Sequence, residues 1–150
     1  MKFTCEVEIN KPIKTVVEIF DNPDNMDKWM EGLISFEPLS GTPGQPGAKS
    51  KLKFKMGKRE VEMIETITVR NLPDEFTGTY EANGVYNISK NKFIPIEPDK
   101  TKYINEQEFE FKGFMKLIGL LMPGAFKKQS MKYLIDFKNF VENGKTVKKS

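Results

Sequence analysis

The chain has 150 residues, of which 38% are hydrophobic and 30% charged, and its formal net charge is +3. This composition predicts one soluble globular domain with a real core, and it excludes two ordinary domains, a disordered chain and a membrane-embedded protein. The net charge is small and lysines are mixed with glutamates, so charge gives no support to nucleic-acid binding. We therefore expect no nucleic-acid partner.

Histidine is absent from the sequence, and Cys5 is the one cysteine. Without histidine the chain cannot use Ser-His or Cys-His nucleophilic catalysis, nor bind zinc or haem through imidazole. A single cysteine excludes an internal disulfide and a thiolate metal cluster, and it fits a reducing compartment. We therefore expect a cytoplasmic protein with no metal and no cofactor, in which any chemistry uses carboxylates, tyrosines or lysines.

The N-terminal part of the chain predicts a strand, two short helices and a second strand. Apolar and polar residues alternate over Lys2–Ile9, as in a half-buried strand that starts the domain and not in a secretion signal. Asn10 followed by Pro12 indicates the start of a short helix, and Asp24 is placed to cap a second one. The segment Leu33–Leu39 then predicts a strand.

A meander of antiparallel strands is predicted next, because turn signals recur between alternating segments. Where two registers compete, we choose the one that pairs opposite charges across the strands on the outer face. The turn at Gly57-Lys58 predicts Phe54 opposite Val61, and the turn at Asn83-Gly84 predicts Tyr80 opposite Asn87. The turn at Asn71–Asp74 predicts Val69 opposite Phe76 on the inner face and Arg70 opposite Glu75 on the outer face. The loop at Pro98–Lys100 predicts Lys92 opposite Glu106.

Glu65 breaks the pattern of its strand, because it falls on the face that Val61, Met63, Ile67 and Val69 share. An ionised carboxylate turned toward a core is costly unless it is paired, hydrogen-bonded or hydrated. The registers put Glu65 in a mostly polar row on the inner face, which suits a partly hydrated cavity better than a dry core. The predicted row is Ser50, Glu65, Tyr80, Asn87 and Phe111.

The last part of the chain predicts a long helical segment with one break. Apolar residues recur at helical spacing from Phe114 to Leu121, and Pro123-Gly124 then indicates a kink or break. A second stripe runs on to Asn143-Gly144, a typical C-terminal stop, and consists of Phe126, Ser130, Tyr133, Phe137 and Val141. We expect one domain over residues 1–144 and a flexible tail over residues 145–150.

This order of elements is that of an α+β helix-grip fold, in which a curved antiparallel sheet wraps around a long C-terminal helix. Short motifs of this chain add to that likeness: Ile9–Pro12 with Val16 and Phe20, Asp21–Pro23 with Trp29, Gly41–Gly44 with Gly47, and Asn71–Pro73. Together they resemble the START/Bet v 1-like (SRPBCC) superfamily, in its polyketide cyclase/dehydrase and lipid-transport branch. The resemblance runs from about Phe3 to Val141 and implies a cavity for apolar or amphipathic small molecules between sheet and helix. Only some members are enzymes, and no catalytic signature of the family transfers to this chain.

Glu65 is the first candidate for a ligand site, with Tyr80 and Ser50 on its flanks. It either anchors a polar group of a ligand, or it is a structural carboxylate that bonds Tyr80 or reaches solvent at a strand bend. A second group either lines a wetter part of the cavity or, if a register shifts by one residue, points outward. That group is Asn87, Ser89, Asn91, Asn105 and Gln107.

Apolar candidates for the ligand site are also suited to an ordinary core, and spacing does not separate the two roles. They are Trp29, Met63, Phe109, Phe126, Tyr133 and Phe137. The apolar segment Phe114–Phe126 is too short to span a bilayer. It acts as a gate, as a membrane- or partner-touching patch, or as a cover packed over the mouth of the sheet.

Three hypotheses for function follow. The first is non-catalytic: a carrier or sensor of a lipid-like or aromatic molecule, acting as a monomer or weak homodimer. The second is a cyclase or dehydratase in which Glu65 transfers a proton and Tyr80 assists. The third is a co-chaperone-like module that binds protein through an apolar outer patch. An apolar surface patch together with the absence of an internal cavity would favour this hypothesis.

Overall fold

A computed structural model describes residues 1–147 of the chain. In chain order its elements are β1 (Lys2–Ile9), α1 (Ile13–Phe20), the 3₁₀ helix η1 (Pro23–Asn25), α2 (Met26–Trp29), β2 (Leu33–Ser40), β3 (Lys49–Met56), β4 (Arg59–Asn71), β5 (Glu75–Ala82), β6 (Val85–Glu97), β7 (Lys100–Phe111), α3 (Phe114–Leu121) and α4 (Pro123–Asn143). The helix-grip prediction is confirmed. The expected flexible tail stays a prediction, since residues 148–150 lie outside the described part of the chain.

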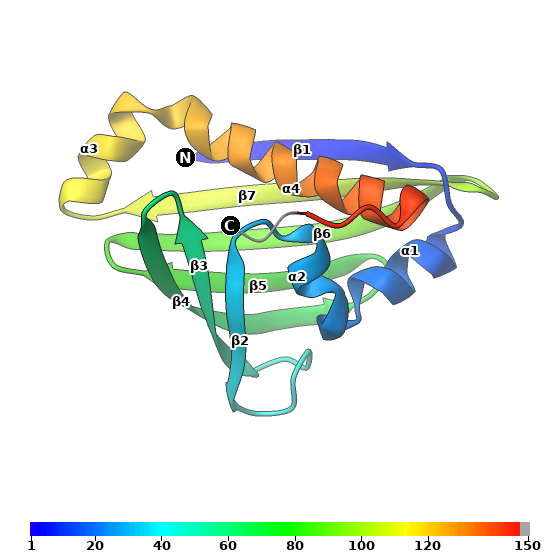
Figure 1. The fold of residues 1–150 in the computed structure, drawn as a ribbon, viewed down its shortest axis with the longest axis horizontal. Helices are drawn as coiled ribbons and strands as arrows, with labels where there is room; N and C mark the ends of the chain where they lie inside the picture. The colour runs from blue at the N-terminus through cyan, green and yellow to red at the C-terminus, as the bar shows by residue number, and fades with distance from the viewer. Residues whose placement is uncertain (148–150) are drawn as a thin grey trace.

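Seven antiparallel strands form one sheet in the order β1-β7-β6-β5-β4-β3-β2, and α4 crosses one face of it, with α1 near one end and α3 near the other (Figure 1). Register shifts interrupt the β2–β3, β4–β5 and β6–β7 pairings. Irregularities of this kind bend a strand and increase its twist, so they curve the sheet. The curved face and α4 together set the space in which a core or a cavity can form.

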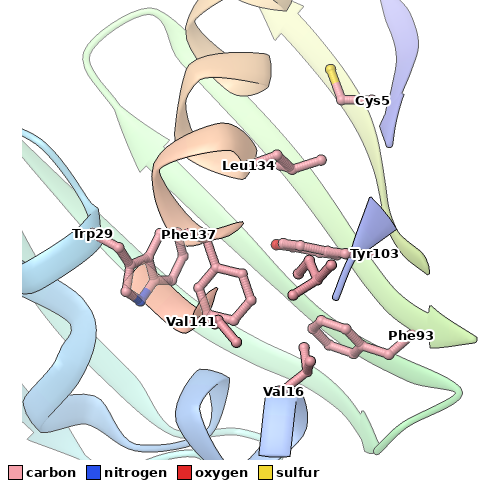
Figure 2. Packing of buried hydrophobic residues seen from close by; sticks show 9 residues of the cluster. Cys5, Val16, Trp29, Phe93, Tyr103, Leu134, Phe137 and Val141 are labelled. Carbon is pink, nitrogen blue, oxygen red and sulfur yellow. The ribbon is translucent and has the colours of Figure 1, made fainter. Parts of the chain in front are cut away.

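The dry core occupies the end of the fold where α1 meets the C-terminal half of α4. Phe137 of α4 is fully buried there, with its ring centre 4.9 Å from that of Trp29 and 5.5 Å from that of Tyr103. Val16 of α1 and Phe93 of β6 belong to the same cluster, as Figure 2 shows. The apolar stripe of α4 therefore packs against the sheet over part of its length.

Several predicted features are confirmed at the level of single residues. The β3–β4 turn pairs Phe54 with Val61, and the β5–β6 turn pairs Tyr80 with Asn87. The helical segment breaks at Met122 before Pro123. Gly144 ends α4 in the left-handed conformation at φ 66°, which glycine adopts without steric cost.

The prediction that Asp24 caps the second short helix is wrong. Asn22 caps η1 instead, because its side-chain oxygen accepts a hydrogen bond from the backbone N–H of Asp24 at 3.0 Å. Pro23 then occupies the first helical position, where its missing N–H costs nothing. The helical region therefore begins two residues earlier than expected.

The predicted register between β4 and β5 is wrong beyond Ile67. A bulge between Ile67 and Val69 pairs Val69 with Thr77, Arg70 with Phe76 and Asn71 with Glu75. The extra residue on β4 shifts the later alternation by one position. Arg70 therefore lines the concave face of the sheet beside Phe76, although we expected it outside.

The β6–β7 register differs from the prediction by two residues. Asn87 lies opposite Phe109, so the central row ends at Phe109 and not at Phe111. A shift of two residues preserves which side chains face inward. Lys92 therefore still forms an outer ion pair with Glu106, at 3.4 Å, although Ile104 is the residue opposite it.

The buried ring of Phe137 supports a stability prediction. Phe137→Ala should lower the free energy of unfolding by about 3–5 kcal/mol, because it leaves a cavity in the dry core. The control Ile135→Ala lies on the same helix but is 43% exposed, and it should cost less than about 1 kcal/mol. Urea unfolding measures both. Equal losses in the two variants would contradict this account of the core.

Candidate functional site

A cavity of about 1050 Å³ lies between the curved sheet and the N-terminal half of α4. The dry core borders it through Trp29, Tyr103 and Leu134, which belong to the buried core cluster and also line the cavity. Nine of the ten predicted ligand-site residues line the cavity: Trp29, Met63, Glu65, Tyr80, Asn87, Ser89, Phe109, Phe126 and Tyr133. The tenth prediction needs correction, since Phe137 is fully buried in the dry core and does not line the cavity.

Glu65 and Tyr80 form the polar centre of the cavity wall. They lie opposite each other on β4 and β5, and the Tyr80 hydroxyl donates a hydrogen bond to Oε2 of Glu65 at 2.8 Å. Glu65 is 7% exposed. Within residues 1–147 no other hydrogen bond reaches its carboxylate, so Oε1 remains available to a ligand.

Burial sets the electrostatics of this pair. Loss of solvent around Glu65 raises its pKa, and the hydrogen bond from Tyr80 opposes that rise only in part. The pKa of Tyr80 lies well above its ordinary value, first because of burial and then because of the neighbouring carboxylate. The carboxyl group can therefore take up a proton more readily than an exposed glutamate, while the tyrosine stays neutral and acts as a hydrogen-bond donor.

The amide and hydroxyl groups beside this pair satisfy one another. Asn105 donates to Ser89 at 3.1 Å and to Asn91 at 2.8 Å, and the Tyr103 hydroxyl donates to the same Asn91 oxygen at 2.6 Å. Gln107 donates to Ser89 at 3.1 Å and accepts from Asn87 at 2.7 Å. All five predicted polar residues face the cavity, so the alternative register that turns them outward is wrong.

An ion pair that the sequence did not predict lies at the wall of the cavity near α1. Arg70 donates to both carboxylate oxygens of Asp21, at 2.8 and 2.6 Å, and to the carbonyl oxygen of Gly44 at 3.3 Å. This bidentate contact ties the end of α1 and the β2–β3 loop to β4. It exists only because the bulge turns Arg70 inward, and strand alternation gives no signal for that bulge.

Aromatic rings form the apolar wall on the α4 side. The ring centre of Phe126 lies 5.2 Å from that of Phe109 and 5.0 Å from that of Phe111. Tyr133 lines the cavity two helical turns further along α4. This wall provides an apolar surface for a ligand on the helix side and leaves the carboxylate on the sheet side.

No group of three or more cysteine, aspartate or glutamate side chains that could hold a metal ion occurs among residues 1–147. In the same range, none of the helices has the length and apolar character needed to cross a membrane.

Comparisons with known proteins agree on the architecture. A family model described as polyketide cyclase/dehydrase and lipid transport matches residues 1–141. No curated protein matches the chain by sequence. The fold is similar to that of the Zhui aromatase/cyclase from Streptomyces sp. R1128, with a TM-score of 0.78 and 10% identity over 98% of this chain and 99% of that one.

Two further solved structures resemble the chain to a similar degree. A conserved protein from Geobacillus kaustophilus gives a TM-score of 0.77 at 18% identity, over 94% of this chain and 95% of that one. Truncated norcoclaurine synthase from Thalictrum flavum gives 0.74 at 13% identity, over 95% of this chain and 94% of that one. At these identities the likeness shows a common fold and no more.

The raised pKa of Glu65 leads to a prediction for the pH dependence of stability. Between the ordinary glutamate pKa of about 4.3 and the raised value, the folded state binds more protons than the unfolded state. Stability contributed by Glu65 therefore falls as pH rises through this window. Relative to Glu65→Gln, the native chain should lose stability with rising pH in urea unfolding.

The Tyr80→Phe background is the control for that measurement. It removes the hydrogen bond that lowers the pKa of Glu65. The pKa of Glu65 should therefore be higher in this background. When Tyr80→Phe is compared with the double variant Tyr80→Phe with Glu65→Gln, the stability difference should keep falling up to a higher pH than in the native background. A relative stability that grows with pH in either background would contradict the direction of the shift.

Proposed function

The chain belongs to the polyketide cyclase/dehydrase and lipid transport family, and from this premise we propose that it binds a small hydrophobic or amphipathic molecule as a carrier or sensor. The cavity beside Glu65 is the observation that carries the proposal, because about 1050 Å³ is enough space for such a molecule. The apolar body would lie against Phe109, Phe126 and Tyr133. A polar end would meet the carboxylate.

The distribution of free polar groups supports a specific orientation for the ligand. The amides and hydroxyls around Ser89 already bond one another, and Arg70 is held by Asp21. Glu65 uses one oxygen for Tyr80 and leaves the other to the cavity. A ligand that offers a hydrogen-bond donor or an amine would therefore gain most at Glu65, since an unpaired buried carboxylate is costly.

Binding can be tested with fluorescent long-chain amines and fluorescent aromatic compounds. We expect saturable binding that Phe126→Ala and Tyr133→Ala each weaken by about tenfold, equivalent to about 1.4 kcal/mol, because each removes a ring from the apolar wall. The matched control is Ile135→Ala, on an exposed position of the same helix. Circular dichroism confirms that the variants fold. Saturable binding that neither cavity variant changes would contradict the proposed site.

A second candidate function is a cyclase or dehydratase reaction at the same site. The observation in its favour is a carboxyl group with a raised pKa, bonded to a neutral tyrosine inside a cavity. Glu65 would move a proton and Tyr80 would assist by donating a hydrogen bond. The protein-binding hypothesis gains less support, because it predicts a fold without an internal cavity, whereas this structure has one.

Glu65→Gln separates the carrier from the enzyme. If Glu65 is a proton-transfer group, the substitution should lower turnover of a bound carbonyl-containing aromatic compound by about 100-fold or more while binding persists, as followed by mass spectrometry of the products. Turnover equal to that of the native chain would remove the catalytic role and leave the anchoring role. Glu81→Gln, at an exposed position of the neighbouring strand β5, is the control.

A further inference from the structure

Helix α3 exposes several large apolar side chains. Leu120 is 77% exposed, Phe114 72% and Leu121 67%. Gly119 is the one buried residue of the helix, and it lies close against the Phe111 ring. We call this surface the α3 patch; it consists of Phe114, Leu117, Leu120, Leu121 and Met122. A contiguous exposed apolar patch of this kind marks an interaction site.

Lysines surround the α3 patch without acidic partners. Lys112, Lys116, Lys127 and Lys128 are all exposed, and none forms a salt bridge within residues 1–147. The sequence contains no aspartate or glutamate from Phe111 to Ile135. Elsewhere in the fold, lysines on the outer face of the sheet pair with glutamates. The charge around α3 is therefore free to act on something outside the protein.

The α3 patch lies at the mouth of the cavity. Phe114 and Met115 of α3 line the cavity, and so do Met56 and Arg59 beside the β3–β4 turn. Met56 is itself an exposed apolar residue. Apolar side chains therefore border the cavity both from α3 and from the β3–β4 turn, which lie at the same end of the molecule in Figure 1. Beside the turn, Arg59 is accompanied by Glu60 and Glu62, which also line the cavity, so the excess of positive charge lies on the α3 side.

We propose that the α3 patch docks the mouth of the cavity onto an anionic lipid membrane. A bilayer surface offers both features that this region lacks: an apolar layer for the leucines and phenylalanine, and anionic headgroups for the lysines. A helix of eight residues is too short to span a bilayer and would lie in the interface. Docking through the α3 patch does not depend on what the cavity holds. If the proposed function also holds, docking would turn the mouth of the ligand cavity toward the membrane.

The test is co-sedimentation of the full chain with vesicles of phosphatidylcholine alone, or of equal parts phosphatidylcholine and phosphatidylglycerol. We expect binding to the anionic vesicles only, and weaker binding as salt rises. Leu120→Asp with Leu121→Asp should reduce it by at least about tenfold. The matched control, Ile94→Asp with Ile96→Asp, changes two exposed apolar residues of β6 and should leave binding unchanged.

Charge is tested separately from apolar contact. Lys127→Glu with Lys128→Glu should weaken binding to anionic vesicles more than Lys14→Glu with Lys145→Glu, which makes the same change in net charge on exposed lysines elsewhere. Equal effects of the two pairs would overturn the proposal. So would a lack of binding to anionic vesicles, or binding that the Leu120 and Leu121 substitutions leave intact.

Two outcomes distinguish this proposal from its alternatives. If sedimentation shows a dimer that Leu120→Asp with Leu121→Asp dissociates, and no vesicle binding, a second copy of the chain covers the patch and membrane docking is overturned. Binding of a fluorescent long-chain amine without vesicles reports on the cavity, because the lysines around the α3 patch do not attract a cation. Because Leu120 and Leu121 do not line the cavity, that double variant should keep binding of the amine while it loses vesicle binding.

Discussion

The curvature of the sheet is the constraint on which the rest of this structure depends. Register shifts in three of the strand pairings bend the sheet, and one helix can pack closely against a bent surface over only part of its length. The C-terminal half of α4 meets the sheet through Phe137 and closes a dry core with α1. In the N-terminal half, Phe126 packs against Phe109 and Phe111 of β7, and a cavity remains between this half and the central strands. The same geometry gives the fold a closely packed end and an open end.

An open end makes it possible to place a carboxylate inside the fold. Glu65 would be costly in a dry core, whereas in the cavity it has a hydrogen bond from Tyr80 and space beside its second oxygen. The neighbouring polar side chains are already bonded to one another, from Asn87 through Gln107 to Asn105. Within residues 1–147 the second oxygen of Glu65 accepts no hydrogen bond from the protein, and for this reason the proposed function places the polar end of a ligand there.

Sequence reasoning predicted much of this architecture and the inward position of Glu65, because strand alternation and the glycine turns at Gly57-Lys58 and Asn83-Gly84 fix the β3–β4 and β5–β6 registers. It failed where the backbone departs from regular alternation: the bulge after Ile67 turned Arg70 into the cavity, and the β6–β7 pairing shifted by two residues. Phe137 could not be separated from the ligand-facing rings, because helical spacing assigns it to the same stripe as Phe126. Which part of that stripe meets the sheet depends on curvature, and no local pattern encodes it.

Glu65 lines the cavity, and Phe114 and Met115 of α3 border it. Under the proposed function, this arrangement would admit a molecule that is poorly soluble in water. The central claim is that the space beside Glu65 is a ligand site. A crystal structure of the chain with a bound amphipathic amine tests it most directly. The account predicts electron density against Phe126, with the amine within hydrogen-bond distance of Glu65. A cavity closed by its own side chains, or a ligand bound elsewhere, would contradict it.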